Sequence, residues 1–385
     1  MSLLPNGPDP DGLLEYSVVY TDRALSHMSK KFQGVMTDLS STLKTVYGAH
    51  SSAIIPGCGT YGMEACARQF GTNKKVLVIR NGFFSFRWTQ IFDTPQMAAD
   101  SVTVLRASPV DGDAAPQYAP PPIDEVVAAI RAQKPDVVFS PHVETSAGII
   151  LPPDYVKAVG AAAPEVGAIF VLDCIASGTV FVNMEESSVD ALITAPQKGW
   201  SGPACAALVM LSEKGRARVE ETQSTSFSLD LKKWVQVMDT YEAGGHMYHA
   251  TMGTDALVQF HEVMAETEKY GFDKIMQDQW DLGNAMRETL AARGFKSVAA
   301  DGFGAPGVVV SYTDNPGFKS GAEFAARGMQ IAGGVPLMLD DYTSSPDFST
   351  FRLGLFGIDK LQNIDRCVKL LEERLDDMGA ERIVA

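Results

Sequence analysis

The sequence contains few of the features that mark disulfide-rich, zinc-binding or membrane proteins. Its five cysteines are scattered over 385 residues: Cys58, Cys66, Cys174, Cys205 and Cys367. They form no CxxC or Cys/His spacing, which argues against a disulfide framework and a metal site. No apolar run is long enough to cross a bilayer, and the N-terminus lacks the pattern of a leader. We therefore expect a cytoplasmic protein without a metal.

Positive charge is also scarce. Lysine and arginine number 32 against 47 aspartates and glutamates, which gives a net charge of −15 and a pI of about 4.8. Such a field repels phosphate backbones and anionic lipids, so we expect neither a nucleic-acid nor a membrane partner. A small anionic substrate remains compatible with a local basic pocket.

The chain has enough apolar residues, 45%, for a large core, and it is longer than one core usually organises. We expect an N-terminal arm over 1–25, a large α/β lobe over 26–265 and a smaller α+β lobe over 266–385. Short apolar runs such as Val76–Ile79 and Ala191–Thr194 alternate with helical segments. This alternation predicts a mostly parallel sheet covered on both faces.

Gly57-Cys58-Gly59-Thr60 forms a turn of small residues before a helical segment. Such a turn exposes backbone N–H groups and the positive end of the helix dipole, which suits a phosphate. It is neither GxGxxG nor a Walker motif, so a dinucleotide or ATP is not indicated. A tight structural connection explains the turn equally well.

Two ionisable residues follow apolar runs of the predicted sheet. Asp173 comes after Ala168–Leu172, at the edge where ligands bind in open parallel sheets, and can either cap the next turn or keep a pyridine nitrogen protonated. Lys198 comes shortly after Ala191–Thr194 among small residues. A lone lysine is usually a solvated charge, whereas a desolvated one can form a Schiff base.

Arg352 stands inside the apolar run Phe351–Leu355. A buried arginine needs a carboxylate or phosphate partner, and its fork binds either one through two hydrogen bonds. A structural ion pair is the alternative. The turn, the aspartate, the lysine and the arginine, in this order, predict a pyridoxal-phosphate enzyme with its cofactor on Lys198.

In these residues the chain resembles fold-type I pyridoxal-phosphate enzymes, in particular the class V aminotransferases around alanine–glyoxylate and serine–pyruvate aminotransferase. The resemblance runs from Met28 to Arg352. It implies a large lobe with a mostly parallel, seven-stranded sheet and a smaller α+β C-terminal lobe. It also implies ping-pong transfer of an amino group from a small, alanine- or serine-like amino acid to a keto acid such as glyoxylate or pyruvate.

The resemblance further implies a set of site residues. Lys198 and Asp173 would be catalytic, and Arg352 would hold the substrate carboxylate. The residues that would bind the cofactor are Cys58, Gly59, Thr60, Phe84, Thr145, Asp173, Gln197, Lys198, Tyr248 and Thr251. Among these, Phe84 would stack on the ring, and Tyr248 and Thr251 would reach the site of a second subunit in a homodimer. Cys58 and Phe84 depart from the family, which usually has serine and a larger aromatic residue there.

Several alternatives share the cofactor or the fold class. Cysteine desulfurases and related lyases usually place histidine before the lysine, where this chain has Gln197. Phosphoserine and phosphonate transaminases also fit the pattern, although a substrate phosphate would require further basic residues. A catalytically silent relative is disfavoured by the intact Lys198, Asp173 and Arg352. A dehydrogenase is disfavoured by the missing glycine fingerprint.

Overall fold

The computed structural model describes residues 7–341 and 348–380. Its centre is a seven-stranded sheet with the order β1-β11-β10-β9-β6-β2-β3. The strands are β1 (Ser51–Pro56), β2 (Val76–Arg80), β3 (Thr103–Arg106), β6 (Val137–Pro141), β9 (Ile169–Asp173), β10 (Ala191–Thr194) and β11 (Ala206–Leu211). Only β11 runs against its neighbours, so the predicted mostly parallel sheet is confirmed.

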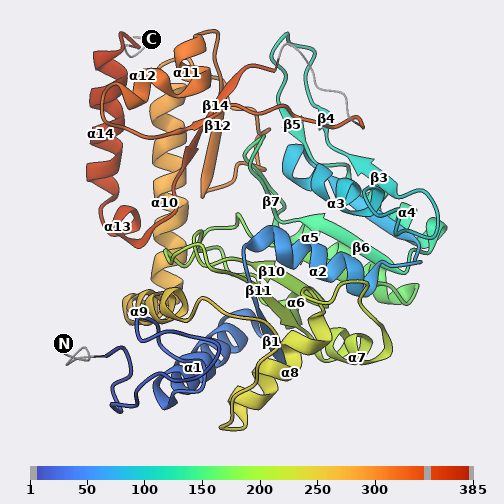
Figure 1. Cartoon of the computed structure of the whole chain (residues 1–385). Coiled ribbons are helices and arrows are strands. Elements are labelled where there is room, and N and C mark those ends of the chain that lie inside the picture. The colour runs from blue at the N-terminus through green and yellow to red at the C-terminus, as the bar shows by residue number, and fades with distance from the viewer. Residues whose placement is uncertain (1–6, 342–347, 381–385) are drawn as a thin grey trace.

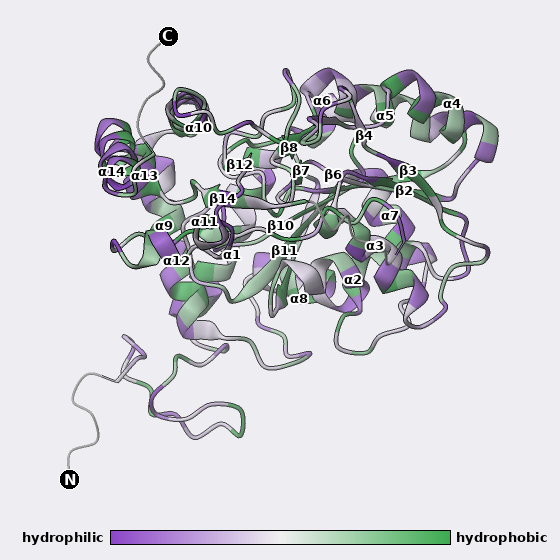
Figure 2. Ribbon diagram, turned by 90° about the horizontal axis from the view of Figure 1, so that it is seen from above, coloured by the Kyte–Doolittle hydropathy of each residue, from purple (hydrophilic) through white to green (hydrophobic). Residues whose placement is uncertain are grey.

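Helices cover both faces of this sheet. Figure 2 shows α4 (Ile123–Gln133), α5 (Pro153–Glu165) and α6 (Met184–Ser187) over one face. The other face carries α2 (Gly59–Phe70), α3 (Phe83–Asp93), α7 (Glu213–Glu221) and α8 (Leu231–Glu242). Strands covered in this way are buried on both sides, which explains why they read as continuous apolar runs.

A second, three-stranded antiparallel sheet forms the core of the C-terminal part. Its order is β12-β14-β13, with β12 (Val308–Tyr312), β13 (Ala332–Gly333) and β14 (Thr350–Gly354). The helices around it are α10 (Phe272–Ala291), α11 (Pro316–Ser320), α12 (Ala322–Ala325), α13 (Ile358–Leu361) and α14 (Ile364–Asp377). Figure 1 shows this small lobe beside the large one. The predicted lobe boundary at residue 265 stays a prediction.

The remaining helices are α1 (Lys30–Tyr47) and α9 (Thr254–Tyr270), and the remaining strands are β4 (Ser108–Pro109), β5 (Tyr118–Ala119), β7 (Val143–Glu144) and β8 (Ile149–Ile150). Helix α1 begins where the Ser29 hydroxyl accepts a hydrogen bond from the Phe32 N–H, and it ends at Gly48 in the left-handed region. No helix in the described ranges is long and apolar enough to cross a membrane.

Candidate active site

A cavity of about 450 Å³ lies at the carboxyl ends of the parallel strands, where the two lobes meet. Nine of the eleven residues predicted for the site line it: Cys58, Gly59, Thr60, Phe84, Thr145, Asp173, Gln197, Lys198 and Arg352. They come from the large lobe except Arg352, which β14 of the small lobe supplies. The fold therefore collects residues that are up to 294 positions apart, from 58 to 352.

Asp173 is the last residue of β9, and its carboxyl group is buried at the cavity wall. Its Oδ1 accepts a hydrogen bond from the backbone N–H of Ile175 at 2.9 Å, so it partly serves the turn, as the capping alternative requires. Burial raises the pKa of this carboxyl group to about 7, and the nearby Glu144 adds to the rise. A cationic group in the cavity would therefore be stabilised beside Asp173.

Lys198 lies in the turn after β10, next to β9 in the sheet. Burial lowers the pKa of its ammonium group, and the positive charges of Arg352 and Arg87 lower it further. Its Nζ lies 5.1 Å from the centre of the Phe356 ring. Among the described residues Lys198 forms no ion pair, so it is the desolvated lysine of the prediction rather than a solvated surface charge.

Glycines let this turn pack closely. A Cβ atom at Gly199 would lie 1.9 Å from the carbonyl oxygen of Gly178, so no larger residue fits there without a backbone shift. Beside the lysine, the Oε1 atom of Gln197 is buried and accepts no hydrogen bond from the described residues. The turn thus places the Lys198 amine at the cavity and leaves a buried acceptor atom of Gln197 without a donor among the described residues.

The predicted phosphate turn opens α2. Cys58 is its N-cap, and the Cys58 side chain accepts no hydrogen bond from the first turn. Arg87 of α3 donates to the Thr60 hydroxyl at 3.2 Å and brings a positive charge to this end of the helix. Three features together suit a phosphate: the uncapped N-terminus of the helix, the hydroxyl group of Thr60 and the guanidinium group of Arg87.

Glu144 fixes the wall that carries Phe84. This carboxylate is fully buried and accepts hydrogen bonds from the backbone N–H groups of Phe84 (3.1 Å) and Ser85 (2.9 Å). It also accepts from the hydroxyl groups of Ser85 (2.7 Å) and Ser146 (2.8 Å). From strand β7, about 60 residues away in the sequence, Glu144 therefore caps α3 and holds the Phe84 ring at the cavity.

Arg352 approaches the same wall from the small lobe. Its Nε donates to the carbonyl oxygen of Gly333 at 2.9 Å, and its Nη1 contacts that of Thr145 at 3.4 Å. Its guanidinium carbon lies 5.6 Å from the Phe84 ring centre. No carboxylate of the described chain forms an ion pair with it, so the structural ion pair considered as an alternative is not formed there. The guanidinium group of Arg352 can therefore donate hydrogen bonds to the carboxylate of a ligand.

The sequence reasoning did not identify three residues at the cavity. Arg87, Phe356 and Glu144 all shape the site, although Glu144 lies behind its wall. Arg87 comes three residues after Phe84 and Glu144 directly precedes Thr145, and each is a charged residue among apolar or small ones. A charged residue in such surroundings was the feature of the sequence that could have identified Arg87 and Glu144. Phe356 gave none, because an aromatic residue after an apolar strand is usual in a core.

Tyr248 and Thr251 lie away from the cavity of their own chain. The Tyr248 side chain is about half exposed, at 49%, and its hydroxyl group is 3.1 Å from the Thr251 hydroxyl. The structure thus brings these two residues together but not to the other nine. Their predicted role at a second subunit stays a prediction.

The fold and the cavity define the class: the chain has the fold of fold-type I pyridoxal-phosphate transferases, as predicted. Ureidoglycine–glyoxylate aminotransferase from Bacillus subtilis superposes with a TM-score of 0.76 at 22% identity, covering 94% of this chain and 89% of that one. No family model matches the sequence.

Within that class, the relatives confirm the resemblance to class V aminotransferases. Alanine–glyoxylate aminotransferase 1 of Saccharomyces cerevisiae is 23% identical over 334 residues, which cover 81% of this chain and 82% of the relative. The soluble hydrogenase 42 kDa subunit of Anabaena cylindrica is also 23% identical, over 365 residues that cover 93% and 88%.

Proposed function

We propose that the protein is a pyridoxal-phosphate-dependent aminotransferase that moves an amino group from a small, alanine- or serine-like amino acid to a keto acid such as glyoxylate or pyruvate. One observation carries this proposal: Lys198, Asp173 and Arg352 converge on one cavity beside the N-terminus of α2. Relatives from yeast and Bacillus subtilis are named for glyoxylate, which supports it as an acceptor.

The residues present fit the cofactor. Thr60, Arg87 and the first N–H groups of α2 would hold its phosphate, and Phe84 would lie against its ring. Asp173 would accept a hydrogen bond from the ring nitrogen and keep that nitrogen protonated. The buried carboxylate favours this, because no cationic side chain among the described residues lies at hydrogen-bond distance from it. When bound, the cofactor supplies an electron sink for the bonds of the substrate α-carbon.

The chain's own residues then divide the remaining work. The amine of Lys198 would hold the cofactor covalently, and its lowered pKa favours the neutral, nucleophilic form. When it is not holding the cofactor, Lys198 Nζ would act as the base that takes the proton from the substrate α-carbon and as the acid that gives it back. Arg352 binds the substrate α-carboxylate and orients the α-carbon toward that amine.

The choice of donor and acceptor is tested by a screen. Purified protein loaded with pyridoxal phosphate should transfer the amino group of alanine or serine to glyoxylate, and that of serine to pyruvate, faster than to 2-oxoglutarate, as the relatives named for glyoxylate suggest. Keto-acid product is measured for each pair. Sustained release of ammonia or sulfide without amino transfer would instead identify a lyase or desulfurase.

Replacing Arg352 with lysine should raise the KM for the amino donor by roughly 30-fold, which corresponds to about 2 kcal/mol. An ammonium group keeps the charge but cannot make the two parallel hydrogen bonds of the fork. Initial rates over a donor concentration series give KM and kcat separately, and the visible spectrum reports cofactor retention. An unchanged KM would show that the carboxylate binds elsewhere.

We also propose that the protein is a homodimer in which Tyr248 and Thr251 complete the partner's site. Their position outside their own cavity and the partial exposure of Tyr248 support this arrangement. Mixing two inactive variants, Lys198→Ala and Tyr248→Ala, should restore part of the activity, since a mixed dimer contains one site with both native residues. Restoration should require refolding or subunit exchange. A mixture that stays inactive although mixed dimers form would contradict the shared site.

A further inference from the structure

Two arginines end neighbouring strands at the same edge of the sheet. Arg80 is the last residue of β2 and Arg106 the last of β3, and they are direct partners in the parallel pairing. The Arg80 side chain is fully buried, while that of Arg106 is 36% exposed. Burial lowers the pKa of Arg80, and the charge of Arg106 lowers it further. Two adjacent guanidinium groups of this kind require a shared anionic partner.

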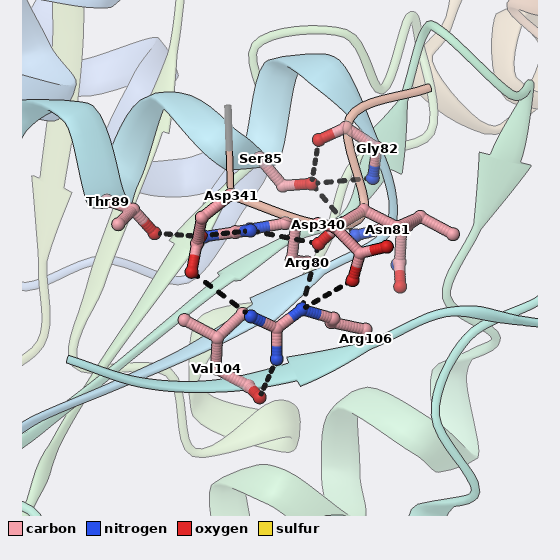
Figure 3. Close-up of polar contacts among 10 residues, drawn as sticks. Arg80, Asn81, Gly82, Ser85, Thr89, Val104, Arg106, Asp340 and Asp341 are labelled. Carbon is pink, nitrogen blue, oxygen red and sulfur yellow. Dashed lines mark hydrogen bonds and ion pairs between the residues drawn. The ribbon is translucent and has the colours of Figure 1, made fainter. Parts of the chain in front are cut away.

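That partner is Leu339–Asp341, a segment of the small lobe (Figure 3). The carbonyl oxygen of Leu339 accepts from Arg80 Nη1 at 2.9 Å and from Arg106 Nε at 2.8 Å. The carboxylate of Asp341 accepts from Arg80 at 2.7 Å and from Arg106 at 3.4 Å. We call these two arginines and this segment the lobe clamp. Because both acceptors are shared, the clamp fixes the backbone of the segment as well as one side chain.

On the large lobe, the clamp is joined to the wall that carries Phe84. Arg80 Nη2 donates to the hydroxyl group of Thr89 on α3 at 2.6 Å, and the Arg80 guanidinium lies 4.7 Å from the Phe86 ring centre. Phe84 opens the same helix, four residues after Arg80. The buried arginine therefore contacts the helix whose first turn bounds the cavity.

On the small lobe, the clamp is joined to Arg352. Leu339 follows β13 by six residues, and β13 pairs with β14 at Ala332 and Arg352. Gly333 in β13 accepts the hydrogen bond from Arg352 Nε, and Ala332 lines the cavity. A shift of the clamped segment would therefore move the carbonyl group that holds Arg352.

We propose that Arg80 and Arg106 are positioning residues for substrate binding: the lobe clamp sets the distance between Arg352 and the Phe84 wall by tying β13 to the large lobe. This inference rests on the proposed function in assigning the substrate carboxylate to Arg352. Between described residues, none of the clamp's hydrogen bonds or ion pairs reaches a residue that lines the cavity. Loss of the clamp should therefore weaken substrate binding while leaving cofactor binding intact.

The test uses Asp341→Asn and Arg106→Gln in the full-length, cofactor-loaded protein. Asp341 and Arg106 are partly exposed, so these variants avoid the removal of the fully buried Arg80. Each should raise the KM for the amino donor about tenfold, which corresponds to about 1.4 kcal/mol, with kcat and the visible cofactor band nearly unchanged. Arg106→Lys should recover part of the loss because the ammonium group still faces Asp341. Backbone hydrogen exchange in 332–333 and 350–354 should become faster.

The matched controls are Arg131→Gln and Glu165→Gln. They break an ion pair outside the lobe clamp whose side chains are 57% (Arg131) and 45% (Glu165) exposed. They should change neither KM nor exchange in these strands. If Asp341→Asn leaves both quantities at the values of the unsubstituted protein, the clamp does not position Arg352. Equal losses in kcat and cofactor binding would also overturn the inference, since they indicate general destabilisation. If the unsubstituted protein transfers no amino group, the proposed function fails, and hydrogen exchange alone then decides the clamp.

Discussion

Replacing Lys198 with alanine is expected to abolish the yellow colour of the cofactor-loaded protein and to lower amino transfer by at least about 10³-fold. The substitution removes the amine that holds the cofactor and, with it, the base that moves the α-proton. Lys198 is desolvated at the cavity, and the described residues that line the cavity include no second lysine that could replace it. Absorption spectra and single-turnover rates measure both effects.

Lys157→Ala is a suitable control, because Lys157 is exposed on α5. It should keep the colour and the rate. A small amine such as methylamine, added to Lys198→Ala, should restore part of the proton transfer without restoring the attachment to the protein. If Lys198→Ala kept the full visible band, another amine would hold the cofactor and the central assignment would be wrong.

Replacing Asp173 with asparagine is expected to lower kcat by about 10²- to 10³-fold. The amide cannot keep the ring nitrogen protonated, so the electrons of the substrate α-carbon lose their acceptor. The visible band should persist, because Lys198 is intact. Asp301→Asn, in an exposed turn, is the matched control. A variant with near-normal kcat would show that Asp173 serves only the turn through Ile175.

The variant Asp173→Asn can also be tested without the cofactor, through the pH dependence of the free energy of unfolding. Burial raises the pKa of Asp173 in the folded chain to about 7, above its ordinary value of 3.8. Between these values the folded state binds a proton that the unfolded state has released, so the contribution of Asp173 to the free energy of unfolding should fall as the pH rises from about 4 to about 7. Urea unfolding of the cofactor-free protein and of Asp173→Asn at several pH values isolates this contribution: the free energy of unfolding of the unsubstituted protein minus that of the variant should fall over this range.

Lys198 and Asp173 could be predicted from the sequence because each follows a buried strand. The carboxyl ends of parallel neighbours meet at one edge, and β9 pairs with β10 so that Asp173 lies opposite Ile193. Locating the two strands in the sequence was therefore sufficient to place both residues at the same edge of the sheet, without knowledge of any side-chain contact. In the small lobe, the apolar run Phe351–Leu355 noted in the sequence corresponds to β14, which begins and ends one residue earlier.

Contacts between distant segments could not be predicted in the same way. Glu144 binds backbone groups about 60 residues away, and Arg80 binds a carbonyl oxygen 259 residues away. Neither pairing leaves a periodic trace in the sequence, because such partners are set by tertiary packing: within the large lobe for Glu144 and between the two lobes for Arg80. Strand β13 contains only two residues and escapes pattern reasoning for lack of length.

The measurement that tests the central claim most directly is a half-reaction. The loaded protein is mixed with an excess of alanine or serine in the absence of any keto acid, and absorbance, keto acid and ammonia are followed. An aminotransferase should lose the visible band, form one equivalent of keto acid per site and then stop until glyoxylate or pyruvate restores the band. Continued release of ammonia, or a band that does not respond to any amino acid, would contradict the account.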